Sequence, residues 1–189
     1  INHFEGDIRD TNLINNTMEE IKPDVVFHLA AQAIVSTSYS DPVGTISTNV
    51  LGTVNVLEAL RKVEHKCAAL IITSDKCYEN NEWIWGYREI DRLGGKDIYS
   101  SSKASAELLI RSYLESFFTE NHKVSIAIAR AGNVIGGGDW AKDRIVPDIY
   151  RSWSSNNSVE IRSPNSTRPW QHVLEPISGY LTLVEKLWN

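Results

Sequence analysis

The chain has 189 residues, 42% of them hydrophobic and 23% charged, and a formal net charge of −5 at pH 7. The length indicates one domain with part of a second. The composition is that of a folded globular protein rather than a disordered or collagen-like chain, and the acidic balance argues against a surface that binds nucleic acid. No apolar run approaches the roughly 18 residues that span a bilayer.

The two cysteines, Cys67 and Cys77, are too few for a disulfide framework and lack the spacing of a metal site, so we expect no metal. The first residues show no signal-peptide pattern. We therefore expect a reducing, cytoplasmic location. Because the chain does not begin with Met and contains only Met18, we also expect it to be a piece of a longer protein.

Predicted strands and helices alternate along the chain. Short apolar runs bounded by turn residues predict buried strands at 25–29, 68–73 and 124–129. Helical periodicity predicts helices at 11–21, 41–63 and 98–121. The second of these starts at Asp41-Pro42, a capping residue followed by proline at the first helical position. The alternation predicts an α/β fold with a doubly wound parallel sheet, whose two faces are covered by right-handed crossovers.

Two irregular segments interrupt this pattern. Residues 74–97 exceed the roughly 15 residues beyond which a loop in a compact domain is usually functional. Because this segment contains Trp83, Trp85 and Tyr87, we expect an ordered active-site loop. Residues 130–144 form a glycine-rich second segment. Weaker patterns then predict a helix from residue 145, a short strand at 159–161 and a final helix at 175–187, which together indicate part of a smaller second unit.

The pair Tyr99 and Lys103 begins the third predicted helix. A spacing of four residues places both side chains on one helical face, and a nearby ammonium favours phenolate, which would make the tyrosine a general base. Such a pair arises by chance in many helices. Here, however, a buried strand ends upstream in Ser74, Asp75 and Lys76, and the carboxyl ends of parallel strands line the ligand crevice of such folds.

The segment 28–32, His-Leu-Ala-Ala-Gln, ends the preceding strand with small residues that let a planar ligand approach the backbone. By contrast, residues 136–141 match the dinucleotide pattern G-x-G-x-x-G/A only formally. Asp139 would place negative charge where a pyrophosphate should lie, and Pro147 would fall within the helix that should follow. We interpret this segment as a flexible loop on the substrate side, and Cys77 as a structural residue.

Taken together, these motifs resemble the extended short-chain dehydrogenase/reductase family of nucleotide-sugar enzymes. The segments that carry the resemblance are 6–10, 28–32, 48–53 and the pair Tyr99 and Lys103. Segments 73–79, 82–89 and 130–140 most resemble the sugar 4,6-dehydratases within it. The family begins with a glycine-rich strand–turn–helix and a second βα unit, which this chain lacks. The resemblance thus implies a partial NAD-binding Rossmann-like domain at 1–144 and, interleaved with it, the start of a substrate-binding region at 145–189.

The resemblance implies NAD as cofactor, CDP-glucose as the nucleotide-sugar substrate, and 4,6-dehydration to a 4-keto-6-deoxy sugar. The implied catalytic residues are Ser74, Asp75, Lys76, Tyr99 and Lys103. The residues implied along NAD are Asp7, Ile8, Ala30, Ala31, Gln32, Asn49, Thr73, Tyr99 and Lys103, and those on the sugar diphosphate are Asn133 and Arg168. Tyr99, hydrogen-bonded by Ser74, would take the proton of the sugar 4-hydroxyl. Related dehydratases commonly have Asp-Glu at Asp75-Lys76, so Asp75 is the implied acid and Lys76 the implied C5 base.

Two alternative functions remain open from the sequence. A nucleotide-sugar 4-epimerase of the same family shares Tyr99 and Lys103 but needs no acid/base pair for elimination, so Asp75 and Lys76 count against it. A non-catalytic dinucleotide-binding protein on this fold would be expected to have lost part of the Tyr/Lys/Ser set, which is complete here. The resemblance also implies a homodimer through a four-helix interface, formed by helices 41–63 and 98–121 with Phe117 and Phe118, and a role in bacterial surface-polysaccharide synthesis such as O-antigen.

Overall fold

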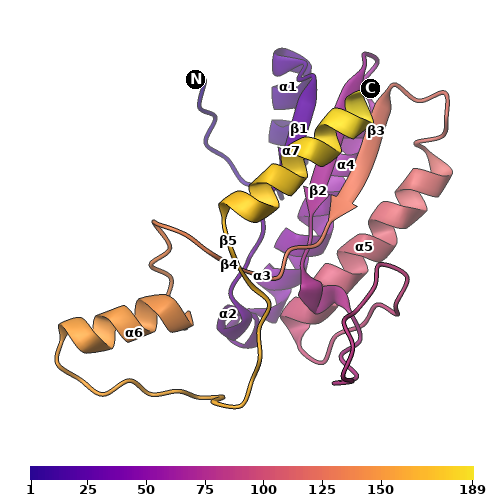
Figure 1. Ribbon diagram of the computed structural model, residues 1–189. Coiled ribbons are helices and arrows are strands. Elements are labelled where there is room, and N and C mark those ends of the chain that lie inside the picture. Colours follow the sequence, from indigo (N-terminus) through magenta and orange to yellow (C-terminus); the bar gives the residue numbers. More distant parts are fainter.

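The computed structural model describes all 189 residues and contains a three-stranded parallel sheet with the strand order β1-β2-β3 (Figure 1). Its elements are, in chain order, α1 (Thr11–Ile21), β1 (Val25–His28), α2 (Val35–Ser40), α3 (Pro42–Ile46), the π-helical turn η1 (Ser47–Leu51), α4 (Gly52–Arg61), β2 (Cys67–Ile72), the 3-10 turn η2 (Asp75–Cys77), α5 (Ile98–Ser116), β3 (Val124–Ala129), β4 (Asn133–Ile135), α6 (Ile145–Ser154), β5 (Trp170–His172) and α7 (Leu174–Trp188).

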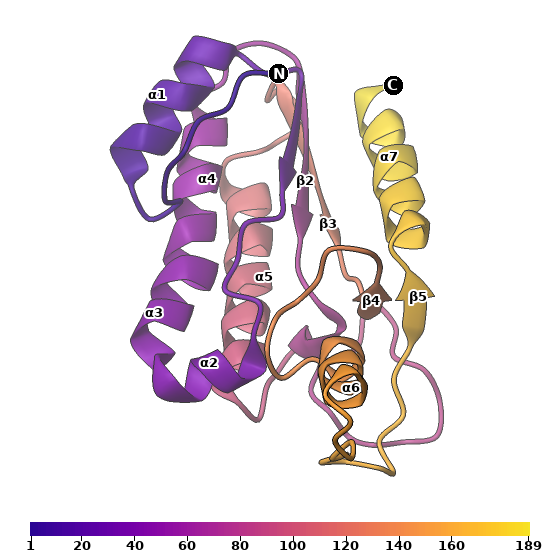
Figure 2. The ribbon, with the colours of Figure 1, turned by 90° about the vertical axis from the view of Figure 1, so that its left-hand side faces the viewer.

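Helices lie on both faces of the sheet, but the prediction that crossovers cover both faces is wrong, because the strands follow one another in the order β1-β2-β3 and same-handed crossovers between them fall on one side. Figure 2 shows α1, α4 and α5 on one side and α7 on the other. Both crossovers between strands lie on the first side, and the helix on the second side is α7, which follows the last strand of the sheet. Val184 of α7 packs on Ala68 and Leu70 of β2, while Val25 and Phe27 of β1, on the same face, are 37% and 39% exposed.

The centre of the core lies between β2 and the two crossover helices. Every residue of β2 except the last is buried, because the strand has a neighbour on each side and helices on both faces. Leu57 of α4, Ile71 of β2 and Ile110 of α5 form one buried cluster. Leu60 joins a second cluster with Cys67 and Val124. This packing fixes α5 against the sheet and thereby sets where its amino-terminal residues lie.

The three predicted strands of the sheet and the first helix are confirmed to within a few residues. The predicted helix at 41–63 is helical from Pro42 to Arg61, but a π-helical turn interrupts it at Ser47–Leu51. The predicted helix at 98–121 ends at Ser116, because Phe117 leaves the helical conformation with φ −129°. The final helix runs over Leu174–Trp188, close to the predicted 175–187.

One predicted strand is wrong. Residues 159–161 form no strand, because no neighbouring strand offers them backbone hydrogen bonds. Two short strands that the sequence did not predict, β4 and β5, pair in parallel with each other, with Asn133 opposite Trp170. β4 follows β3 and β5 precedes α7, so their pairing brings these two parts of the chain together. Helix α6, which lies between them in the sequence, lies apart from the sheet (Figure 1).

Candidate active site

Tyr99 and Lys103 lie on the buried face at the start of α5, and each is only 7% exposed. Asp97 caps the helix and accepts a hydrogen bond from the backbone N–H of Ser100 at 2.9 Å, which fixes where the helix begins. The spacing of four residues therefore brings both side chains to one face, as predicted. This pair is the centre of the candidate site.

The electrostatics of the pair differ from the expectation. The pKa of Tyr99 is raised, chiefly by burial, although the Ser74 hydroxyl acts in the opposite direction. Burial also lowers the pKa of Lys103 to about 8. The chain by itself therefore does not show the expected lowering of the tyrosine pKa, because burial dominates the pKa of Tyr99 and the main group that opposes it is Ser74.

Ser74, Asp75 and Lys76 form a tight turn directly after β2. Asp75 Oδ1 accepts a hydrogen bond from Ser74 Oγ at 3.1 Å and lies 3.2 Å from Lys76 Nζ. Ser74 Oγ in turn accepts from the backbone N–H of Lys76 at 3.3 Å and caps η2. The turn therefore holds a carboxylate, an ammonium and a hydroxyl together, as the sequence predicted.

Gln32 and Asn49 bind each other rather than presenting free side chains. The Asn49 amide accepts from the backbone N–H of Gln32 at 2.8 Å and donates to its carbonyl oxygen at 3.0 Å. It also donates to Ser102 Oγ on α5 at 2.9 Å, while the Gln32 side chain donates to Thr45 at 2.8 Å. Asn49 lies in the π-helical turn and is 2% exposed. The Asn49 amide thus joins the loop after β1 to α5, and the Gln32 amide joins the same loop to α3.

His28, at the end of β1, belongs to the same buried network, although no role was predicted for it. Its Nε2 lies 3.1 Å from Thr53 Oγ1, and Thr53 donates to the carbonyl oxygen of Asn49 at 2.8 Å. Burial, together with the charge of Lys103, lowers the pKa of His28 to about 4. A neutral histidine therefore borders the lysine of the site.

Glu107 is the most deeply buried carboxylate near the site, and the sequence reasoning missed it. It is 0% exposed, accepts from Thr73 Oγ1 at 2.6 Å and forms an ion pair with Arg130 after β3. A signal was available, because Glu107 follows Lys103 at the same four-residue spacing that separates Tyr99 from Lys103. Residues at such spacing share one helical face.

The two predicted substrate residues lie near each other because β4 pairs with β5. Asn133 faces Trp170 in this pairing, two residues beyond Arg168, and Pro169 packs against Gly132. Asn133 Oδ1 is buried without a hydrogen-bond partner, while Arg168 is exposed and donates to the carbonyl oxygen of Thr167 at 2.7 Å. An unpaired buried oxygen is costly unless something else satisfies it.

The amino-terminal candidates form no hydrogen bond or ion pair with Tyr99. Asp7 lies on an exposed segment before α1, where Arg9 holds its carboxylate through two 3.0 Å hydrogen bonds and a 2.5 Å ion pair. The Ile8 side chain packs on Gly52 at the start of α4. Ala30 is exposed and Ala31 is half-buried in the loop that follows β1.

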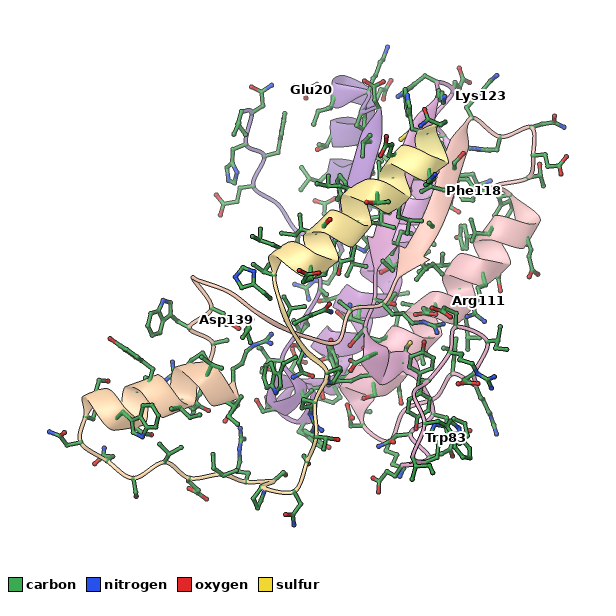
Figure 3. The ribbon with its side chains drawn as sticks, in the orientation of Figure 1. Glu20, Trp83, Arg111, Phe118, Lys123 and Asp139 are labelled. Carbon is green, nitrogen blue, oxygen red and sulfur yellow. The ribbon has the colours of Figure 1, made fainter.

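The loop at 74–97 has an aromatic core. Trp83 lies against Trp85 and Tyr87 with ring centroids 5.6 and 5.2 Å apart, and Tyr87 stacks on Tyr78 at 5.0 Å. Figure 3 shows Trp83 within this loop, beyond the carboxyl end of the sheet. Cys77, where the loop starts, is fully buried, and burial raises the pKa of its thiol to about 12, which supports a structural role.

The glycine stretch at 136–138 does not run directly into a helix, since α6 begins only at Ile145. Pro147 lies in the first turn of that helix, where proline is tolerated. This arrangement differs from a dinucleotide-binding loop, in which the glycines lead straight into the helix whose amino terminus faces the pyrophosphate.

A parallel sheet with a buried tyrosine and lysine at its carboxyl edge defines a Rossmann-like α/β protein. Comparison with known proteins gives the family: the model of the GDP-mannose 4,6 dehydratase family matches residues 1–186. The chain belongs to this family, which confirms the resemblance to nucleotide-sugar dehydratases stated from the motifs.

Individual relatives refine this picture. The chain is 54% identical to a CDP-glucose 4,6-dehydratase of Salmonella typhimurium, over 97% of this chain and 52% of that protein. It is 28% identical to a dTDP-D-glucose 4,6-dehydratase of Dictyostelium discoideum, over 97% of this chain and 43% of that protein. The chain therefore spans about half the length of the curated relatives it matches.

Among solved structures, the fold is similar to that of a dTDP-glucose 4,6-dehydratase from Streptomyces venezuelae with NAD bound. The TM-score is 0.83 at 22% identity, and the match covers 95% of this chain and 53% of that one. At this identity the likeness establishes the fold. None of the helices in the structure is long and apolar enough to cross a membrane.

Proposed function

We propose that the protein to which this chain belongs is an NAD-dependent dehydratase that converts CDP-glucose to CDP-4-keto-6-deoxyglucose. The observation that carries the proposal is that η2, with Asp75 and Lys76, packs against α5, where the Ser74 hydroxyl is hydrogen-bonded to Tyr99, in a chain 54% identical to a CDP-glucose 4,6-dehydratase. We further propose that it acts in the cytoplasm, in the synthesis of deoxysugars for bacterial surface polysaccharides.

The residues present fit the nicotinamide end of NAD. Ala30 and Ala31 leave the loop after β1 without large side chains, and Tyr99 and Lys103 are buried on the helix at the same edge of the sheet. When bound, NAD supplies a hydride acceptor that takes hydrogen from C4 and returns it to C6, and a positively charged ring. Thr73 and the hydrogen-bonded pair of Gln32 and Asn49 would line the pocket around the nicotinamide ring.

Tyr99 would take the proton of the sugar 4-hydroxyl as C4 is oxidised. Burial raises the pKa of Tyr99, so phenolate must be stabilised by positive charge in the complete complex. Lys103, one helical turn away, supplies one such charge, and its own pKa of about 8 leaves it mainly protonated at neutral pH. The Ser74 hydroxyl lowers the pKa of the tyrosine further.

The ion pair of Asp75 and Lys76 would carry out the loss of water. Because the two groups lie 3.2 Å apart, the ammonium can first pass a proton to the carboxylate, which leaves a neutral amine and a protonated carboxyl. The 4-ketone acidifies the proton on C5, the Lys76 amine removes that proton, and the Asp75 carboxyl protonates the departing 6-hydroxyl, so that the ion pair forms again. Return of the C5 proton from Lys76, as C6 takes the hydride, and one further proton taken up from water by Asp75 restore the neutral pair.

Asn133 and Arg168 would hold the sugar diphosphate. The buried Asn133 Oδ1 lacks a partner, and a hydroxyl of the substrate would satisfy it. The exposed Arg168 has a guanidinium fork that could bind phosphate in two places. The preference for cytosine is supported by the difference in identity between the CDP-glucose and dTDP-glucose relatives, 54% against 28%.

A homodimer is part of the proposal. Val43, Ile46 and Leu108 are 75%, 43% and 55% exposed on α3 and α5, which pack side by side, and such exposed apolar residues on the two helices are what the predicted four-helix interface would bury. Phe118 does not belong to that surface, because it packs into the core. Phe117 is half-exposed beneath the guanidinium of Arg61.

The test separates oxidation from dehydration in the intact protein. Lys76→Ala should retain Tyr99-dependent hydride transfer, followed by absorbance of reduced nicotinamide in a single turnover, and should lose formation of the 4-keto-6-deoxy product. The matched control is Lys62→Ala, the same substitution at an exposed lysine that follows α4, which should behave as wild type. Unchanged product formation in Lys76→Ala would remove Lys76 from the mechanism.

A further inference from the structure

Glu107 stands on the same face of α5 as the two central residues of the site. Tyr99, Lys103 and Glu107 follow one another at intervals of four residues, so their side chains form one row along the helix. All three are buried, and Glu107 is the deepest at 0% exposure. A charged group in such a place needs partners that satisfy it fully.

The two hydrogen-bonding partners Thr73 and Arg130 of Glu107 come from the ends of two neighbouring strands, while Arg111, one turn further along α5, lies 3.7 Å from Oε2. Thr73, immediately before the Ser74 turn, donates to Oε1 at 2.6 Å. Arg130, directly after β3, donates to Oε1 through Nε at 2.7 Å and to Oε2 through Nη2. Burial would raise the pKa of Glu107, but the hydrogen bonds from Arg130 and Thr73 outweigh it and lower the pKa. The carboxylate therefore stays ionised and bonded in fixed directions.

Arg130 extends this contact to the aromatic loop. Its guanidinium lies 4.5 Å from the centroid of the Tyr78 ring, and its Nη1 donates to the carbonyl oxygen of Glu89 at 3.4 Å. One two-point ion pair thus joins α5, the ends of β2 and β3, and the loop that follows the catalytic turn.

We propose that Glu107 and Arg130 form a positioning pair, which fixes the depth and rotation of α5 relative to the Ser74–Asp75–Lys76 turn. This inference rests on the proposed function and assigns both residues an indirect role, through the elements that they hold together. A buried ion pair is weak evidence for stability, since apolar residues often replace one without loss. Its bidentate geometry instead restricts orientation, and a displacement of about 1 Å between reacting groups can cost about a hundredfold in rate.

The first test is Glu107→Gln in the intact protein. Glutamine keeps the shape of the side chain and an acceptor for Thr73, but it turns an N–H group toward the arginine. The matched control is Glu115→Gln, the same substitution on an exposed part of the same helix. In case Glu107→Gln does not fold, Arg130→Lys keeps a cation beside the buried carboxylate and removes only the fork.

We expect Glu107→Gln to lower kcat about tenfold or more, with KM for the nucleotide sugar within about threefold of wild type. Arg130→Lys should also lower kcat with little change in KM, but by a smaller factor. Glu115→Gln should have the kcat and KM of wild type. Equal kcat in a folded Glu107→Gln or Arg130→Lys variant, or a loss that appears in KM alone, would overturn the inference.

A second readout does not depend on activity. Backbone hydrogen exchange of residues 73–77 should become at least about threefold faster in either variant, while the centre of α5 stays protected, because the arginine fork no longer holds in place the group to which Thr73 donates. Exchange at wild-type rates would refute the positioning role. Failure of the wild-type protein to turn over any nucleotide sugar would instead refute the proposed function and leave this measurement to decide about the pair.

Discussion

Replacement of His28 by glutamine should reduce the loss of the free energy of unfolding that occurs as the pH falls from 7 to 4. His28 is 6% exposed, and its Nε2 lies 3.1 Å from Thr53 Oγ1. Because the Thr53 hydroxyl donates to the Asn49 carbonyl, it can only accept from the histidine. The geometry therefore assigns the neutral form with the proton on Nε2. Glutamine can donate to Thr53 in the same way but cannot take up a proton.

The magnitude follows from the pKa. Burial, and secondly the charge of Lys103, lower the pKa of His28 from 6.5 to about 4. At 1.36 kcal/mol per pKa unit, this difference corresponds to about 3 kcal/mol. Between pH 6.5 and about 4 the unfolded chain binds a proton at this position that the folded chain does not. The stabilisation is thus complete above pH 6.5 and is lost as the pH falls to about 4.

The assay is urea unfolding, followed by circular dichroism, at pH 7 and pH 4. From pH 7 to pH 4, wild type should lose about 3 kcal/mol more of its free energy of unfolding than His28→Gln loses. The matched control His3→Gln, on an exposed residue, should lose as much as wild type. Equal losses in wild type and His28→Gln would refute the assignment of a buried neutral histidine.

Further substitutions test the core and the site. Lys103→Met should raise the free energy of unfolding at pH 7 by about 2–3 kcal/mol in urea titrations, because it removes a buried ammonium whose pKa is lowered to about 8, and should abolish turnover; a less stable variant would contradict this. Leu57→Ala, at a side chain of 0% exposure, should cost about 2–5 kcal/mol by the same measurement, and a loss below about 1 kcal/mol would show that the site is not packed as described. Arg130→Met should cost about 3–5 kcal/mol, since it removes the two-point ionic partner of the buried Glu107 carboxylate and leaves only Thr73 and the more distant Arg111 beside it. Tyr99→Phe should lower turnover about a hundredfold or more with little change in the unfolding midpoint; retained turnover would exclude the tyrosine as base.

The sheet could be predicted from the sequence because its strands are marked locally. The runs at Val25–His28, Cys67–Ile72 and Val124–Ala129 are apolar and bounded by turn residues, as expected of buried parallel strands. The strands β4 and β5 have only three residues each and pair across a long stretch of chain. Such short strands have no readable periodicity, since their existence depends on the partner. The alternation of Val159, Glu160 and Ile161 likewise suggested a strand, which does not form because the fold offers it no partner strand.

The site was predictable where it consists of residue types at a fixed spacing, as with Tyr99 and Lys103. The site was not predictable where the hydrogen-bonding groups of a side chain bind a residue elsewhere in the fold. Gln32 and Asn49 bind each other across the loop after β1, and no local pattern shows this. The raised pKa of Tyr99 likewise depends on burial, which only the packing of α5 against the sheet determines.

The most direct test of the proposed function is turnover of CDP-glucose by the intact protein with NAD, with UDP-glucose and dTDP-glucose in parallel. The 4-keto product is detected by its absorbance in alkali. The account predicts product from CDP-glucose, with the other two sugars turned over poorly or not at all. A 4-epimerised sugar without loss of water, or no product from CDP-glucose by a protein that binds NAD, would contradict it.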